Sequence, residues 1–206
     1  MAEDIVFYTN PMSRGRIVRW MLEEVGQAYH TEIIFYGEAM KSAGYRAINP
    51  MGKVPALRHG DTIVTETAAI CAHLADAFPE AGLVPPSGQR GTYYRWLFFG
   101  AGPFEAAIGD RALGVEIPKK REQMMGYGTF ETMQATLKQA VSGDAFITGS
   151  QFTAADVYIG GQIGFGLQFG TLEKCAEFES YVARISARSA YQRANEIDDA
   201  LMPDMA

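Results

Sequence analysis

The nine residues from Asn49 to Leu57, Asn-Pro-Met-Gly-Lys-Val-Pro-Ala-Leu, constrain the fold more than any other stretch. Pro50 and Pro55 fix their own φ angles and push the preceding residues toward extended conformations. Gly52 permits a turn that a residue with a Cβ resists. Pro55 has no N–H to donate at the start of a strand, so the main chain of Val54 is free for another partner. An edge strand entered through a tight turn is one interpretation, and a pairing site for an extended peptide ligand is the other.

The next residues predict a β-hairpin that leads into a helix. His59-Gly60-Asp61 indicates a turn within residues 54–65, and a helix is expected over residues 66–78. Free N–H groups at a helix N-terminus attract a carboxylate. The carboxylate of Glu66 can bind an ammonium group, and Thr67 adds a hydroxyl. This end of the hairpin therefore offers a site for an amino-acid head group.

The order of elements predicts an α+β chain with a mixed sheet first. Strands are expected over 5–9 and 31–35, and a helix between them has apolar residues at 17, 18, 21, 22 and 25 and ends at Gly26. A loop with a weak helix covers 37–47. With the hairpin and the helix after it, the order is βαβαββα. A helical connection between the first two strands implies that they pair in parallel, which indicates a thioredoxin-like domain.

The second half of the chain has a helical pattern throughout. Its predicted helices cover 92–112 with a kink at Gly102-Pro103, 121–141, a segment capped by Thr153 and Asp156, 178–187 and 189–196. The region between the halves is rich in proline and glycine. The expected organisation is a thioredoxin-like domain over 1–79, a linker over 80–90 and an all-helical bundle domain over 91–206.

Composition excludes several classes of function. The 206 residues carry a net charge of −6, which argues against general nucleic-acid binding. The N-terminus has no secretory signal, no apolar run reaches membrane-spanning length, and the three histidines form no metal-like cluster. Cys71 and Cys175 form no redox or zinc motif. We therefore expect a cytoplasmic protein without a membrane or nucleic-acid partner and without a metal.

The motif Asn-Pro-x-Gly-Lys-Val-Pro-x-Leu, followed after a hairpin by Glu66-Thr67 and a helix, resembles the soluble glutathione transferases. The helical second half, with its Thr153-x-x-Asp156 box, is similar as well. The resemblance implies that glutathione is the co-substrate and that Pro55 follows a cis peptide bond. It also implies that the main chain of Val54 pairs with the cysteinyl part of glutathione, while Glu66 and Thr67 hold the γ-glutamyl group.

Glutathione transfer needs a group that stabilises a thiolate near neutral pH. Lowering a thiol pKa by about two units takes about 2.7 kcal/mol of preference for the charged form. A donated hydroxyl and a helix N-terminus together supply an effect of this order. Ser13, before the first helix, and Tyr8, at the end of the first strand, both carry a hydroxyl. Pro11 two residues before Ser13 resembles the serine classes of the family, so Ser13 is the predicted residue and Tyr8 the alternative.

Further site residues are assigned with less specific signals. Lys53 is either a solvated side chain or a contact for the glycyl carboxylate of glutathione. Arg19 is expected to pair with Glu23 and Glu24 on the helix surface, and Arg14 is left open. The second substrate is expected to be a small hydrophobic electrophile, and its candidate lining is aromatic or sulfur-containing: Met12, Phe99, Phe104, Phe165 and Phe169.

These features predict a glutathione transferase that activates the glutathione thiolate for attack on an electrophile or on a peroxide. The family resemblance implies a homodimer. One alternative is a non-catalytic interaction or stress module with the same fold, and another is a glutathione-dependent isomerase or dehalogenase. The loop over residues 10–15 contains no cysteine, which argues against a reductase that uses its own thiol.

Overall fold

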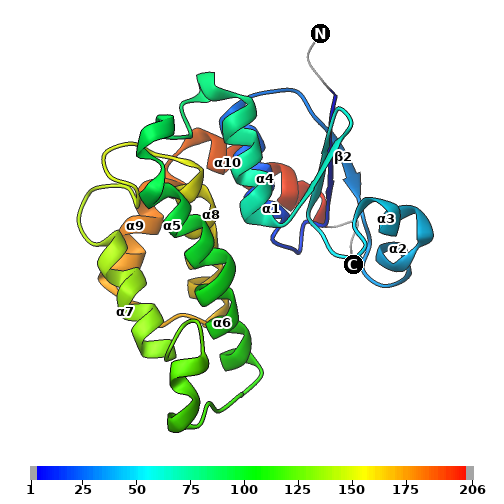
Figure 1. The fold of residues 1–206 in the computed structure, drawn as a ribbon. Coiled ribbons are helices and arrows are strands. Elements are labelled where there is room, and N and C mark those ends of the chain that lie inside the picture. The colour runs from blue at the N-terminus through cyan, green and yellow to red at the C-terminus, as the bar shows by residue number, and fades with distance from the viewer. Residues whose placement is uncertain (1–3, 203–206) are drawn as a thin grey trace. The chain divides into compact units, whose positions relative to one another are not determined.

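The computed structural model describes residues 4–202. By packing, the chain divides into two compact units (Figure 1). The first runs up to Leu83 and also includes the segment from Ala187 onward, and the second spans Val84–Ser186. The sequence assigned that last segment to the helical domain, whereas packing groups it with the sheet.

The first unit is built on a four-stranded mixed sheet with the strand order β2-β1-β3-β4. Strand β1 pairs in parallel with β2 and antiparallel with β3, which pairs antiparallel with β4. Helices α1 and α4 lie on one side of the sheet, and the short helices α2 and α3 lie on the other (Figure 1). The predicted thioredoxin-like fold is confirmed. The bounds of these elements are β1 Ile5–Thr9, α1 Gly15–Val25, β2 His30–Ile33, α2 Glu38–Lys41, α3 Ala43–Ile48, β3 Ala56–His59, β4 Thr62–Thr65 and α4 Thr67–Ala77.

Helix α1 buries the predicted apolar stripe against the sheet. Ile17, Val18, Met21 and Leu22 are at most 2% exposed, and Gly26 ends the helix with a φ of 74°. Helix α1 begins so close to β1 that a Cβ on Gly15 would lie 1.9 Å from Oγ1 of Thr9. A larger residue here would force Thr9 or the start of the helix to shift.

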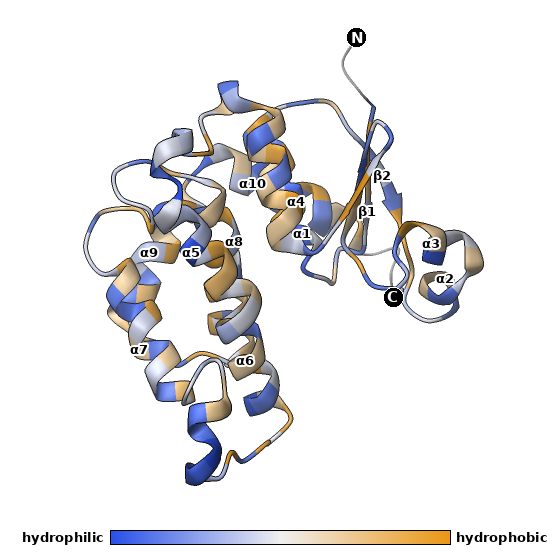
Figure 2. Ribbon diagram, viewed as in Figure 1, coloured by the Kyte–Doolittle hydropathy of each residue, from blue (hydrophilic) through white to orange (hydrophobic). Residues whose placement is uncertain are grey.

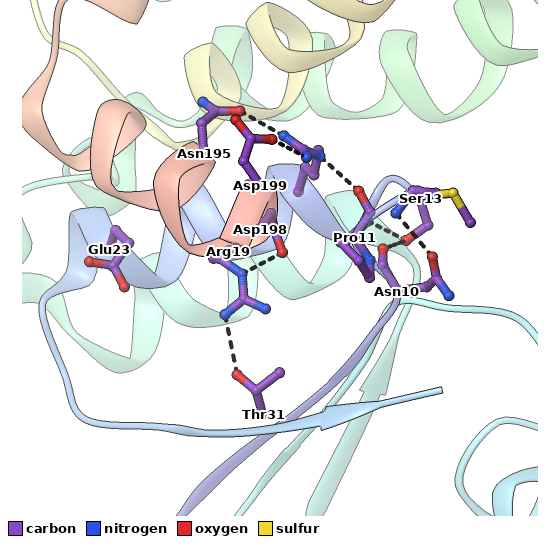
Figure 3. A network of polar contacts seen from close by, with 12 residues as sticks. Asn10, Pro11, Ser13, Arg19, Glu23, Thr31, Asn195, Asp198 and Asp199 are labelled. Carbon is purple, nitrogen blue, oxygen red and sulfur yellow. Dashed lines mark hydrogen bonds and ion pairs between the residues drawn. The ribbon is translucent and has the colours of Figure 1, made fainter. Parts of the chain in front are cut away.

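Helix α10 (Ser189–Ala200) packs along α1 within the first unit. The rings of Trp20 and Tyr191 meet edge to face with their centroids 4.9 Å apart. Nε of Arg19 donates to Oδ1 of Asp198 at 2.7 Å, and both side chains are 1% exposed (Figure 3). The C-terminal segment therefore supplies part of the core of the sheet unit.

The prediction that Arg19 pairs with the glutamates of its own helix is wrong. Glu23 instead pairs with Arg193, and Glu24 pairs with Arg188, so both glutamates face the C-terminal segment. Arg19 points from α1 into the protein, where its guanidinium lies over the ring of Phe7. Arg19 and Asp198 are equally buried, so each neutralises the other's charge away from water, whereas the two glutamates are already paired with arginines of the C-terminal segment.

The second unit is helical, as predicted. Pro103 lies within a π-helical turn, η3, which joins α5 to α6 at the predicted kink. The predicted helix over 121–141 is wrong in its first part, because Gly126 and Gly128 interrupt it and Thr129 caps a helix that begins at Phe130. The first unit also contains η1 Pro79–Ala81. The elements of the second unit are η2 Ser87–Gln89, α5 Gly91–Phe99, η3 Gly100–Phe104, α6 Glu105–Ala112, η4 Lys119–Met124, α7 Phe130–Val141, α8 Ala154–Phe169 and α9 Ala176–Ser186.

Helix α8 is the central element of this unit and is mostly hydrophobic along its length (Figure 2). The predicted capping box is present, with Thr153 and Asp156 each bonding the other's main chain. Asp156 is fully buried and also accepts bonds from the N–H of Ile147 and the hydroxyl of Tyr181, each at 2.8 Å. Burial raises the pKa of Asp156, and these donors partly offset the increase. Within residues 4–202, no helix is both long and apolar enough to cross a membrane.

Candidate functional site

The sequence Asn-Pro-Met occurs twice, at residues 10–12 and 49–51, and forms the same turn both times. In each turn, Oδ1 of the asparagine accepts the N–H of the methionine two residues later at 3.0 Å. Nδ2 of Asn10 donates to the carbonyl of Ile34, and Nδ2 of Asn49 donates to that of Lys53. Both asparagines are buried. Asparagine before proline is a known turn signal, so these supporting residues could have been found from the sequence, although their roles were missed.

Ser13 closes the first of these turns and begins the approach to α1. Its Oγ donates to the carbonyl of Asn10 at 2.7 Å and accepts the N–H of Gly15 at 2.9 Å. The side chain is half-buried. A hydroxyl proton can rotate toward a new acceptor, and the adjacent helix N-terminus favours a negative charge. Ser13 is therefore held where it can donate to an anion at the start of α1.

Tyr8 lies on the other face of the sheet. Successive side chains of a strand point to opposite faces, so Tyr8 points away from the side on which Thr9 meets α1. The Tyr8 ring packs on Tyr45 with centroids 6.1 Å apart. Its hydroxyl bonds to Arg58 and thereby raises the pKa of that guanidinium. The two candidate hydroxyls are thus not brought to one place.

Val54 presents an unused main chain. Its peptide bond to Pro55 is cis, as the resemblance implies. Within residues 4–202, neither the N–H nor the C=O of Val54 has a hydrogen-bond partner. The preceding carbonyl, of Lys53, is fixed by the Tyr45 hydroxyl at 2.6 Å and by Nδ2 of Asn49. Burial and the neighbouring Tyr8 raise the pKa of Tyr45 to about 12, so Tyr45 remains a donor.

Glu66 and Thr67 form the N-terminus of α4. Glu66 is exposed and has a φ of 68°, the one positive φ of a non-glycine residue in the described part of the chain. A side chain in this region is strained, and such residues often cluster at binding sites. The first main-chain bond of α4 runs from Ile70 to Glu66, so the N–H groups of Thr67, Ala68 and Ala69 precede the helical ladder. These groups can bind an anion.

The sheet register brings the Ser13 turn, the Val54 main chain and Glu66 to one end of the sheet, which is called the glutathione edge for its proposed ligand. Tyr8 in β1 pairs with Ala56 in β3, and Ala56 pairs with Thr65 in β4. The turn that leads to Ser13, the Val54 main chain and Glu66 therefore all extend from the same end of the sheet. Neighbouring strands are about 4.8 Å apart, so three strands span about 10 Å. An extended tripeptide is about 10 Å long and could reach all three features.

The other candidate residues differ in exposure. Lys53 is exposed, whereas Pro55 is buried. Among the proposed pocket residues, Met12 is 50% exposed and Phe169 is 71% exposed, while Phe104 is 2% exposed and packs in the core of the helical unit. Phe99 and Phe165 are half-buried, and the rings of Phe165 and Phe169 lie 6.1 Å apart. Phe98, which the sequence analysis passed over, is 73% exposed on α5.

The cysteines offer no nucleophile in this region. Cys71 is fully buried in α4, and burial raises the pKa of its thiol, which leaves it protonated. Cys175 lies in the second unit, before α9. Among residues 4–202, no group of three or more histidine, cysteine or acidic side chains could hold a metal ion.

Comparison with known proteins finds relatives of this chain. The family profile "Glutathione S-transferase, N-terminal domain" matches residues 12–77. Glutathione S-transferase A of Pleuronectes platessa is 27% identical over 182 residues, which cover 82% of this chain and 80% of that protein. Disulfide-bond oxidoreductase YghU of Escherichia coli is 30% identical over 188 residues, which cover 83% of this chain and 64% of that protein.

The fold agrees as well. A crystal structure of a glutathione transferase from Methylococcus capsulatus superimposes with a TM-score of 0.78 at 26% identity, covering 95% of this chain and 99% of that one. The thioredoxin-like unit followed by a helical unit is thus the fold of a glutathione transferase. The chain belongs to the cytosolic glutathione transferase superfamily.

Proposed function

We propose that the protein is a glutathione transferase that transfers glutathione to a small hydrophobic electrophile. The observation that carries this proposal is the main chain of Val54, which has no hydrogen-bond partner among residues 4–202 and lies, by the sheet register, between the Ser13 turn and Glu66. A strand-like ligand can pair with such a main chain. Glutathione is a peptide with a thiol, an amino-acid head group and a terminal carboxylate, so it has a matching group for each part of this edge.

The proposed binding mode assigns each group of glutathione to a residue. The cysteinyl main chain pairs with Val54 next to the cis bond of Pro55. The γ-glutamyl ammonium binds Glu66, and its carboxylate binds the N–H groups and hydroxyl at Thr67. Lys53 is placed to attract the glycyl carboxylate. This arrangement leaves the sulfur directed toward the start of α1.

Ser13 supplies the proposed activation. Its hydroxyl turns from the carbonyl of Asn10 toward the sulfur and donates to the thiolate, while the thiol proton leaves to solvent. The thiolate then attacks the electrophile: a carbon–sulfur bond forms, and either a leaving group departs with its electron pair or a proton adds to the neighbouring carbon. Stabilising the thiolate by about 2.7 kcal/mol lowers its pKa by about two units. With a peroxide, the thiolate would instead attack one oxygen, break the oxygen–oxygen bond and release an alcohol once it is protonated; a second glutathione would then reduce the resulting sulfenic acid, giving glutathione disulfide and water.

The proposals for the electrophile-binding residues and for the oligomeric state follow from the resemblance to glutathione transferases. Met12, Phe99, Phe165 and Phe169 keep exposed surface that an apolar electrophile could contact. Phe104 is left out because of its burial. We propose a homodimer, which sedimentation or light scattering would check; a monomer at micromolar concentration would contradict this part alone.

The test is a glutathione titration followed by a thiolate titration. Calorimetry measures binding, and ultraviolet absorbance of the bound thiolate against pH measures its pKa in the wild type and in Ser13→Ala. We expect wild-type binding with a lowered thiol pKa, and in Ser13→Ala a thiol pKa that rises by about one to two units with little loss of affinity. A loss of activity in Tyr8→Phe with an unchanged Ser13→Ala would reverse the assignment. An absence of binding would favour a non-catalytic module.

Glutathione-dependent disulfide reduction is a second candidate, favoured by the similarity to Disulfide-bond oxidoreductase YghU. The same thiolate would attack one sulfur of a disulfide and release the other as a thiolate. A second glutathione would then resolve the mixed disulfide, giving glutathione disulfide and a second thiol. No protein cysteine takes part in this sequence. A panel with a chlorinated nitrobenzene, a small disulfide, a haloalkane and a maleyl ester would separate transferase, reductase, dehalogenase and isomerase activities.

A further inference from the structure

Arg16 joins the C-terminal helix to the turn that leads to Ser13. Its Nε donates to the carbonyl of Pro11 at 2.7 Å, on one side of the guanidinium. On the other side, NH1 donates to Oδ1 of Asn195 at 3.1 Å and NH2 donates to Oδ1 of Asp199 at 2.5 Å (Figure 3). Three nitrogens of one planar group are thus used, and they connect residues that are far apart in sequence.

The carbonyls of this turn have few supports. The carbonyl of Asn10 accepts from the N–H and the hydroxyl of Ser13, so that contact is local. The carbonyl of Met12 accepts from the hydroxyl of Tyr36 at 3.2 Å. Among the described contacts to these carbonyls, the one to Pro11 has a charged donor, and charge-assisted hydrogen bonds are the stronger kind. Together with the bond from Nδ2 of Asn10 to Ile34, it holds the turn from outside.

The hydrogen bond from Arg16 can fix the Pro11 carbonyl in one position only if the guanidinium of Arg16 is itself held in place. A long arginine side chain is mobile unless its head group is held, and its rigid planar fork transmits a fixed orientation when two sides are held. Asp199 and Asn195 lie one turn apart on α10 and hold the same side of the guanidinium. We infer that Arg16 is a positioning residue, oriented by Asp199 and Asn195, through which helix α10 sets the place of the Ser13 hydroxyl.

This inference rests on the proposed function of Ser13, and it adds residues near the C-terminus to the glutathione site. A plain interhelix ion pair is the competing explanation. The chain supplies a control, because Glu23 and Arg193 also join α1 to α10 through a partly exposed ion pair, at 3.2 Å. Glu23 lies seven residues beyond Arg16, about 10 Å further along α1. That pair makes no contact with residues 10–13 among the described contacts.

The experiment compares Asp199→Ala, Asp199→Glu, Arg16→Lys and Arg193→Ala in the full chain. The first readout is amide hydrogen exchange of the peptide that contains residues 10–15, measured without glutathione. The second is the thiol pKa of bound glutathione, with kcat and KM for a chlorinated nitrobenzene. Urea unfolding of each variant separates a general loss of stability from a local effect.

We expect faster exchange over residues 10–15 in Asp199→Ala and Arg16→Lys but not in Arg193→Ala. The thiol pKa should rise in the same two variants, and kcat/KM should fall about tenfold through kcat, equivalent to about 1.4 kcal/mol. Arg16→Lys keeps the positive charge but cannot hold the turn and α10 at once. Asp199→Glu should restore most of both readouts, since it keeps the anchoring carboxylate.

Equal effects in Asp199→Ala and Arg193→Ala would overturn the inference, because both would then act through stability alone. An unchanged thiol pKa in Asp199→Ala, with a lowered pKa in the wild type, would overturn it while the proposed function holds. If the wild type itself forms no bound thiolate, the proposed function fails. The exchange data then decide the coupling between α10 and the turn independently, and unchanged exchange would refute it.

Discussion

At the scale of single residues, the proposed site combines strained and unsatisfied groups that stability alone would not favour. Glu66 has a positive φ, and the main chain of Val54 lacks a partner within the described part of the chain. Backbone strain of this kind costs about 1–3 kcal/mol and persists when the surroundings enforce it. A residue that serves only the fold would be expected to be glycine at position 66.

Replacing Glu66 separates binding from stability. Glu66→Gly should keep or raise the free energy of unfolding, because relief of about 1–2 kcal/mol of strain exceeds the entropy cost of glycine. Glu66→Ala retains the strain, so it should gain nothing. Both variants should weaken glutathione binding, since both lack the carboxylate. Urea unfolding and calorimetry would check this, and glutathione bound by Glu66→Gly as tightly as by the wild type would remove Glu66 from the site.

At the scale of elements, local signals predicted local structure. Gly26 ends α1, Thr153 with Asp156 caps α8, and Pro103 marks the irregular turn between α5 and α6. Each of these signals acts within one turn of a helix, so the sequence is sufficient to read it. The missed break before Phe130 was also local: Gly126 and Gly128 punctuate the run, and the apolar periodicity obscured them.

Tertiary partners could not be predicted in the same way. Arg19 finds Asp198 across a sequence separation of 179 residues, and no periodicity encodes that pairing. The candidate site at the end of the sheet could be predicted from the sequence because a motif of adjacent residues, Asn49 to Leu57, forms part of it. The support of that edge by Tyr45, and of the Ser13 turn by Arg16, depends on packing that only the structure provides.

The link between α8 and α9 predicts a pH-dependent stability effect. Burial raises the pKa of Asp156 above its unfolded value, so its contribution is full below about pH 4 and is lost as pH rises through the folded pKa. Tyr181 donates to the charged form. Tyr181→Phe should therefore raise that pKa further and lower stability by about 1–3 kcal/mol at pH 7, but by less near pH 4. Urea unfolding at the two pH values checks this, and equal losses would contradict it.

At the scale of the whole molecule, the first unit is discontinuous in sequence. Residues up to Leu83 and the segment from Ala187 onward pack together, while Val84–Ser186 forms the second unit. The contact between them inside the first unit is made by α1 and α10, with a buried ion pair, an aromatic pair and several surface pairs. The sheet unit therefore depends on residues from both ends of the described chain.

Breaking the buried pair should unfold this unit preferentially. Asp198→Ala leaves the Arg19 guanidinium buried without its carboxylate, which typically costs about 3–5 kcal/mol. Arg193→Ala, at a partly exposed pair between the same helices, should cost at most about 1 kcal/mol. Urea unfolding followed by Trp20 fluorescence would measure both, because Trp20 packs on α10. Similar losses of unfolding free energy in the two variants would show that the buried pair contributes no more to stability than the partly exposed pair.

The discontinuity of the first unit has a consequence for biosynthesis. The strands and helix α1 are translated before α10. The ion pair between Arg19 and Asp198 can form only after Asp198, 179 residues later in the sequence, has been made. The second unit, a continuous segment, can fold while synthesis continues. During that interval α1 lacks the surface of α10 that packs on Trp20. Until α10 is made, this apolar face of α1 stays uncovered, and exposed hydrophobic surface of this kind promotes aggregation.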